Sequence, residues 1–105
     1  MSYIMPKKFD CFSEFYSFYL TEHTHRTSRR LHVVGTLGAF VQGLSAILWS
    51  QPWLAITAIF SAYSFAWAGH IFFEKNIPAS FKHPFYSLCG DLALVRDVLA
   101  GKITW

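Results

Sequence analysis

A run of 43 residues without Asp, Glu, Lys or Arg, residues 31–73, constrains this chain more than any other feature. Helices on the surface of soluble proteins carry charged residues on their solvent face, and this run has none. One helical crossing of a bilayer needs about 20 predominantly apolar residues, so the run is long enough for two. We therefore predict that it crosses a membrane twice.

The run contains one clear break, a Ser-Gln-Pro sequence at residues 50–52. Proline disfavours a helical conformation in the residue before it and fits the first turn of a new helix. We therefore predict an integral membrane helical hairpin whose spans are residues 31–49 and 53–73. Trp49 and Trp53 would flank the turn, since tryptophan is common at a membrane–water interface.

Composition and charge placement support a lipid bilayer as the partner of this chain. Charged residues make up 14% of the chain, against roughly 25% in typical soluble proteins. All nine Lys and Arg lie outside the hairpin, so the positive-inside rule places both termini in the cytosol of a bacterial inner membrane or an endoplasmic reticulum membrane. We expect no nucleic-acid partner, because the basic residues flank apolar segments and do not alternate with stacking aromatics.

Two further helices are predicted outside the hairpin, which makes the expected fold all-α. Aromatic residues recur at helical spacing and predict a short N-terminal aromatic helix that ends near His23: Phe9, Phe12, Tyr16 and Tyr19. After the hairpin, an apolar repeat predicts a C-terminal amphipathic helix that ends at Gly101: Leu88, Leu92, Val95 and Leu99. The length of 105 residues fits a single membrane-embedded helical domain, residues 1–105.

Two histidines are predicted to meet at one end of the hairpin. His32 lies 19 residues before Gln51 and His70 lies 19 after it, so straight antiparallel helices place both rings at the same membrane depth. Each histidine also extends a stripe of small residues that lets helices pack closely: Gly35, Ala39 and Gly43 in the first span, and Ala58, Ala62 and Ala66 in the second. We expect both rings to point into the helix interface.

Other histidines can approach this pair. Thr27 and Ser28 are suitable N-cap residues for a helix that begins at Arg29, so the preceding chain can fold back and bring His23 toward the pair. The prolines at positions 78 and 84 keep the intervening segment from continuing the helix and let His83 return as well. His25 is expected to be solvated. The candidate catalytic and metal-ligating residues are therefore His23, His32, His70 and His83.

Two acidic residues are candidates for supporting roles. Glu74 follows His70 by four residues and lies on the same face of an α-helix, where it would bind the metal, orient an imidazole or simply end the span as an exposed charge. Asp91 would either support a ligand or belong to the polar face of the last helix. The residues alone leave these alternatives open.

Four segments of the chain resemble the 2-hydroxy fatty acid dioxygenases, a family long described as a domain of unknown function. They read YLTEH at 19–23, RRLHVVGT at 29–36, AWAGHIFFEKNIPA at 66–79 and FKHP at 81–84. The family includes a fungal endoplasmic-reticulum enzyme of phytosphingosine breakdown. The resemblance implies that His23, His32, His70 and His83 match the family's iron-associated histidines.

The resemblance also implies a reaction, in which an Fe(II)-dependent dioxygenase shortens a 2-hydroxy fatty acid by one carbon. The acid and dioxygen would give the shorter acid, carbon dioxide and water, with all four electrons supplied by the substrate. No nicotinamide or flavin is then needed, and the chain is too short to contain a nucleotide-binding domain. Imidazole ligands suit Fe(II), and three or four of them leave positions open for substrate and dioxygen.

Two other functions fit the same residues. Opposed histidines at equal depth would also ligate haem from both sides, as in an electron-transfer membrane subunit. The chain would alternatively be a non-catalytic helix-packing membrane protein without a metal. Self-association into a homo-oligomer is left open by the sequence.

Overall fold

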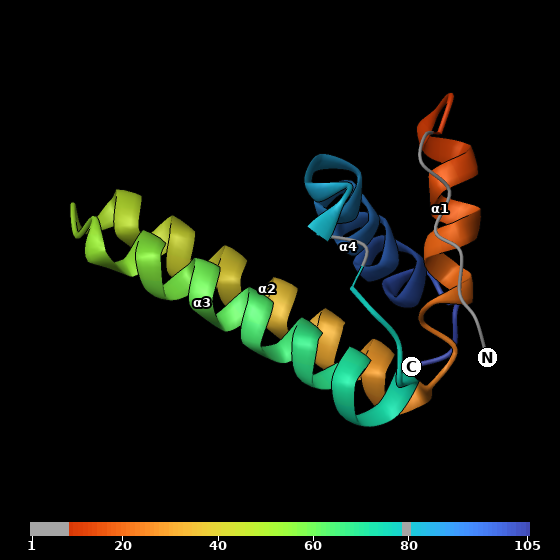
Figure 1. Cartoon of the computed structure of the whole chain (residues 1–105). Coiled ribbons are helices and arrows are strands. Elements are labelled where there is room, and N and C mark those ends of the chain that lie inside the picture. Colours follow the sequence, from red (N-terminus) through yellow and green to blue (C-terminus); the bar gives the residue numbers. More distant parts are fainter. Residues whose placement is uncertain (1–8, 79–80) are drawn as a thin grey trace.

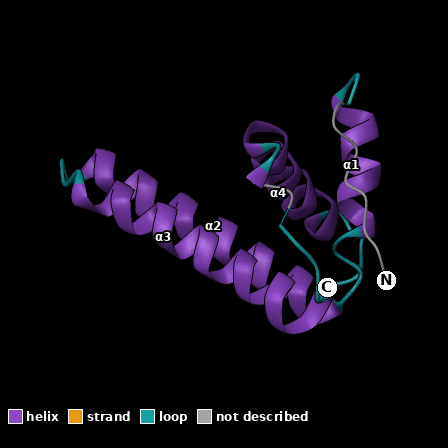
Figure 2. Cartoon of the chain, in the orientation of Figure 1, coloured by secondary structure: helices purple, strands orange, loops and turns teal. Residues whose placement is uncertain are grey.

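The computed structural model describes residues 9–78 and 81–105, and over these residues every regular element is a helix (Figure 2). The elements are α1 (Phe12–Thr21), α2 (Arg26–Leu48), α3 (Trp53–Ala68), η1 (Gly69–Glu74) and α4 (Pro84–Leu99). η1 is a π-helix that continues α3. The predicted all-α fold, with a helical hairpin between two flanking helices, is confirmed.

α2 and α3 lie side by side and antiparallel, and they extend away from α1 and α4 (Figure 1). The predicted spans 31–49 and 53–73 fall on α2 and on α3 with η1. Both helices are long and apolar enough to cross a membrane, and only 17% of the most apolar stretch of each is buried by the rest of the protein. A core helix of a soluble protein would be mostly covered, so this exposure fits the predicted hairpin.

The start of α2 differs from the prediction. The helix begins at Arg26, three residues before Arg29, and its N-cap is His25, whose Nδ1 accepts a hydrogen bond from the backbone N–H of Thr27 at 3.1 Å. The imidazole nitrogen thus supplies the acceptor that Ser or Asp usually provides at this position. Ser28, predicted as a cap, is instead fully buried inside the helix.

Close packing at the base of the hairpin depends on two glycines. A Cβ at Gly35 would lie 2.7 Å from the Cβ of Phe65, and a Cβ at Gly69 would lie 2.8 Å from the Oγ of Ser28. Gly43 was predicted to belong to the same contact, but a Cβ there would meet nothing within 4 Å. The interpretation of Gly43 is therefore wrong, and glycine is required for close approach only near the histidine end.

The core of the protein lies at this same end, where α4 packs against α2 and α1 packs against α4. Its buried members are Phe15, Tyr19, Val33 and Leu94. The Tyr16 hydroxyl of α1 donates a hydrogen bond to the Asp97 carboxylate of α4 at 2.6 Å. These contacts hold the two flanking helices beside the segment that carries the histidines.

Candidate metal centre

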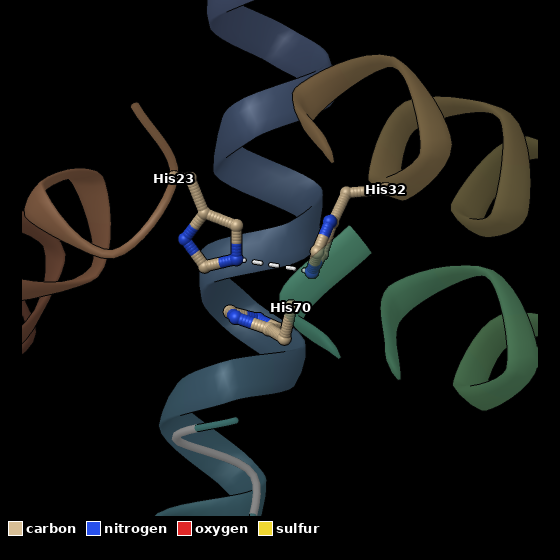
Figure 3. Close-up of side chains that lie close together, drawn as sticks. All are labelled: His23, His32 and His70. Carbon is tan, nitrogen blue, oxygen red and sulfur yellow. Dashed lines mark hydrogen bonds between the residues drawn. The ribbon is translucent and has the colours of Figure 1, made fainter. Parts of the chain in front are cut away.

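Three histidines from three separate segments meet at the base of the hairpin. His23 lies in the connection between α1 and α2, His32 in the second turn of α2, and His70 in η1. One ring nitrogen of each lies within 4.8 Å of the other two. Figure 3 shows the three rings gathered in front of α4. At most 4% of each residue is exposed, so the structure brings these three predicted site residues together in a buried group.

Hydrogen bonds fix the position of the ring hydrogen in His23 and His32. Nδ1 of His23 lies 2.6 Å from the carbonyl oxygen of Tyr19, and Nδ1 of His32 lies 2.8 Å from that of Ser28. A carbonyl oxygen only accepts hydrogen bonds, so Nδ1 is the donor in both rings. The other nitrogen of each neutral ring, Nε2, therefore carries a lone pair.

Asn76 fixes the third ring in the same way. The Nδ2 of Asn76 donates to the backbone oxygen of Glu22 at 3.1 Å and to its carboxylate at 3.2 Å, so the Asn76 Oδ1 is the atom that faces His70. That oxygen accepts from Nδ1 of His70 at 2.5 Å. Nε2 of His70 is thereby left with its lone pair, as in His23 and His32.

The π-helix explains how Asn76 reaches the ring. η1 ends at Glu74, its C-cap residue Lys75 has a left-handed backbone with φ of 61°, and the N–H of Asn76 then bonds back to the carbonyl oxygen of His70 at 3.2 Å. This wide turn returns the Asn76 side chain to the His70 ring. Neither Asn76 nor Glu22 was identified as a site residue from the sequence, because their roles depend on a turn that helical spacing does not predict.

The ring nitrogens that face one another suit a metal ion. Nε2 of His23 and Nε2 of His32 are 3.0 Å apart, and both Nδ1 hydrogens are already engaged elsewhere. Metal–imidazole bonds are about 2.0–2.1 Å long, so one ion can reach both atoms. Burial, and then the nearby His32 and His70, lower the pKa of His23, which keeps it in the neutral form that binds metals. Histidine ligands usually donate their second N–H to a carbonyl or carboxyl oxygen, as here.

A cavity of about 420 Å³ opens beside the histidine group between α2, α3 and α4. Beyond the histidines its walls are mainly apolar and include Ala39, Ala58, Ala62 and Leu88. Ala58 precedes His70 by 12 residues, about 18 Å along a helix. The cavity therefore has room for an elongated apolar ligand whose polar end lies at the histidines.

The model of one protein family, described as 2-hydroxy-palmitic acid dioxygenase Mpo1-like, matches residues 9–103. The chain belongs to the Mpo1-like family. The resemblance found in the sequence is thus confirmed, and His23, His32 and His70 all lie within the matched segment. A search of curated proteins and a search of solved structures each gave no match.

In this Mpo1-like chain, His83 has neighbours other than the three histidines. It precedes α4 as its N-cap residue, and its ring packs against Phe9, Phe15 and Tyr86, with centroid distances of 5.0, 5.8 and 6.4 Å. The structure does not bring its ring into the group of His23, His32 and His70. A ligand role for His83 stays a prediction.

The two acidic candidates contact the surroundings of the group. Glu74 accepts hydrogen bonds from the backbone N–H groups of Thr24 and His25, at 3.2 and 3.0 Å, and so ties η1 to the connection that carries His23. Asp91 accepts from the Tyr19 hydroxyl at 2.6 Å, and burial raises the pKa of Asp91 to about 6. His25 is exposed, as predicted.

Proposed function

We propose that this chain is an Fe(II)-dependent dioxygenase that shortens 2-hydroxy fatty acids by one carbon. The observation that carries the proposal is the arrangement of His23, His32 and His70. Their Nδ1 hydrogens are all engaged by oxygen acceptors, so three Nε2 lone pairs remain for one ion. Family membership supports the reaction class.

The donor set fits iron. Three neutral imidazoles suit Fe(II) and leave coordination positions open, which an oxygenase requires. Iron would supply the binding and activation of dioxygen, a reaction that amino-acid side chains do not perform alone. A haem is less compatible with the same residues, since a porphyrin ligated by His32 and His70 would have to fit between two rings whose centroids are 4.9 Å apart.

The protein's own residues would bind and orient the fatty acid. The apolar walls of the cavity would hold the alkyl chain and exclude water, and the acid head would lie at the histidine end. The balanced reaction converts the 2-hydroxy acid and dioxygen into the acid one carbon shorter, carbon dioxide and water. A hairpin inserted in a lipid bilayer would give this cavity direct access to lipid-derived substrates.

The proposal is tested with His32→Ala and His70→Ala. Each variant should lose iron and the consumption of 2-hydroxy acid while it still enters the membrane, because each removes one of three nitrogen ligands. The measurements are metal analysis after anaerobic purification and oxygen uptake with 2-hydroxypalmitate. His25→Asn is the matched control, since it removes an exposed histidine and keeps a good N-cap residue.

Two results would contradict the proposal. Normal turnover in both His32→Ala and His70→Ala would exclude the histidine group as the iron site. A strong Soret band in the purified protein would identify haem instead. His83→Ala tests the fourth predicted ligand: loss of iron in this variant would establish His83 as a ligand, and retention of iron would exclude it.

A further inference from the structure

One face of α4 presents two polar side chains to a cavity whose other walls are mainly apolar. Ser87 and Asp91 are four residues apart, so they lie on the same side of the helix, and both line the cavity that contains the three histidines. Figure 3 shows α4 passing behind the histidine rings. Neither residue is among the three that would hold the metal.

Ser87 has an unused hydrogen-bonding group. Only 7% of the residue is exposed, and within the described part of the chain its Oγ has no hydrogen-bond partner. A buried hydroxyl without a partner is unfavourable, and alanine would fill the same space without that cost. Because Ser87 also lines the cavity, we take a polar atom of a ligand as the missing partner of its Oγ.

Asp91 is held in place by one of its two carboxylate oxygens. Oδ1 accepts from the Tyr19 hydroxyl, and the Tyr19 ring stacks on His23 with a centroid distance of 4.0 Å. Gly90 permits this arrangement, because a Cβ there would lie 2.8 Å from the Tyr19 ring. The carboxylate is thus fixed beside the histidine group, and Oδ2 has no hydrogen bond to any described residue.

We propose that Ser87 and Asp91 recognise the polar head of the fatty acid and select the 2-hydroxylated acid over the unsubstituted one. An ionised carboxylate only accepts hydrogen bonds, so Asp91 needs a donor from the ligand. The 2-hydroxyl group is such a donor, whereas an unsubstituted fatty-acid anion has none. The Ser87 hydroxyl would donate to the ligand's carboxylate. The substrate class in this inference rests on the proposed function.

The test measures binding without turnover. Iron-loaded full-length protein in detergent is kept anaerobic, and the dissociation constants of radiolabelled 2-hydroxypalmitate and palmitate are compared. The wild type should prefer the hydroxylated acid. Asp91→Asn should weaken binding of 2-hydroxypalmitate about tenfold or more, because a charge-assisted hydrogen bond is lost, and should not weaken palmitate binding, because palmitate has no hydroxyl group that donates to Asp91. Asp91→Leu should abolish the preference.

Ser87→Ala should weaken the binding of both acids, because the donor to the shared carboxylate is removed. Cys89→Ser, an exposed change on the same helix, is the control and should have no effect. Iron content and helicity identify any variant that has lost its fold. Asp91→Asn should stay folded, because its amide oxygen can still accept the hydrogen bond from the Tyr19 hydroxyl.

The outcomes separate this inference from the proposed function. Equal affinities of the wild type for the two acids, or an unchanged preference in both Asp91 variants, would overturn the selective role of Ser87 and Asp91. If the wild type prefers 2-hydroxypalmitate and the Asp91 variants lose that preference, the selective role is supported, even if the iron-loaded wild type consumes no 2-hydroxy acid. Absence of consumption would refute the proposed dioxygenase activity but not the selective role.

Discussion

At the scale of single residues, the histidine group is defined by the partners of its second nitrogens. Two of these partners are carbonyl oxygens four residues earlier in the chain, Tyr19 for His23 and Ser28 for His32. The third is the side chain of Asn76, which is itself held by Glu22. Backbone oxygens cannot be removed by substitution, so the Asn76 contact is the one that mutation can test.

Asn76→Ala is expected to lower the metal affinity about ten- to a hundredfold, the usual cost of losing a partner that orients a histidine ligand. Without the amide oxygen, the His70 ring can rotate and exchange its tautomer. Competition with a chelator of known affinity measures the change. Glu22→Gln should have a smaller effect, because its amide oxygen still accepts from Asn76, and an equal loss in both variants would contradict this order.

At the scale of elements, the site depends on how closely α2 approaches α3 and η1, and on how α1 is held against α4. Gly35 determines how closely α2 approaches α3, since its missing Cβ leaves room for Phe65. The hydrogen bond between Tyr16 and Asp97 helps to hold α1 against α4. Changes at these positions should alter stability without removing any metal ligand.

Gly35→Ala should destabilise the hairpin by about 1–3 kcal/mol, because the added methyl group would overlap Phe65. Gly43→Ala should instead be neutral or slightly stabilising, since it meets open space and alanine is the better helix former. Thermal unfolding in detergent, followed by circular dichroism, compares the two. A similar shift for both would contradict the difference in packing.

The docking of α1 on α4 should weaken in acid. The Arg96 guanidinium, and then the Tyr16 hydroxyl, lower the pKa of Asp97 below its ordinary 3.8. The stabilisation is therefore fully present above that value and is lost as the pH falls through the folded-state pKa. Asp97→Asn should lower the unfolding temperature at pH 7, and it should remove the part of the stability that is lost in acid. An unchanged pH profile in the variant would contradict the assignment to Asp97.

Over the molecule as a whole, the chain has two parts: a base with the buried histidines at its centre, and an apolar hairpin that extends from this base. Away from the histidines, the hairpin exposes large apolar side chains, such as Ile47 at 77% and Phe60 at 69%. On α4, Phe85 is also 83% exposed. Water would cover these surfaces only at a high free-energy cost, so a bilayer is the environment that we propose.

The predicted topology is tested by cysteine labelling. Gln51→Cys, in a background with Cys11→Ser and Cys89→Ser, should react with an impermeant maleimide added outside intact cells or to the lumenal side of vesicles, because the turn would lie opposite the cytosol. The native Cys11 and Cys89, both exposed, should react only from the cytosolic side. The reverse pattern would refute cytosolic termini.

Residue spacing alone was enough to predict the helical hairpin and the meeting of His32 and His70. An apolar run, a proline and a residue count are local properties, and helix geometry converts them directly into spans and depths. His23 was also expected at this group, although the cap assigned to α2 was wrong. The prediction that small residues let the two helices pack closely was correct at Gly35 and wrong at Gly43.

The atoms that surround the three rings depend on how the helices pack, and residue spacing did not predict them. The rule that residues four apart share a face assumes an α-helix, and the π-helix breaks it, so that the His70 ring forms its hydrogen bond with Asn76 and not with Glu74. The packing of His83 against Phe9 and the access of Ser87 to the cavity likewise depend on how α1 and α4 dock. Such long-range contacts are set by the shapes of all the packed side chains together, which residue spacing does not encode.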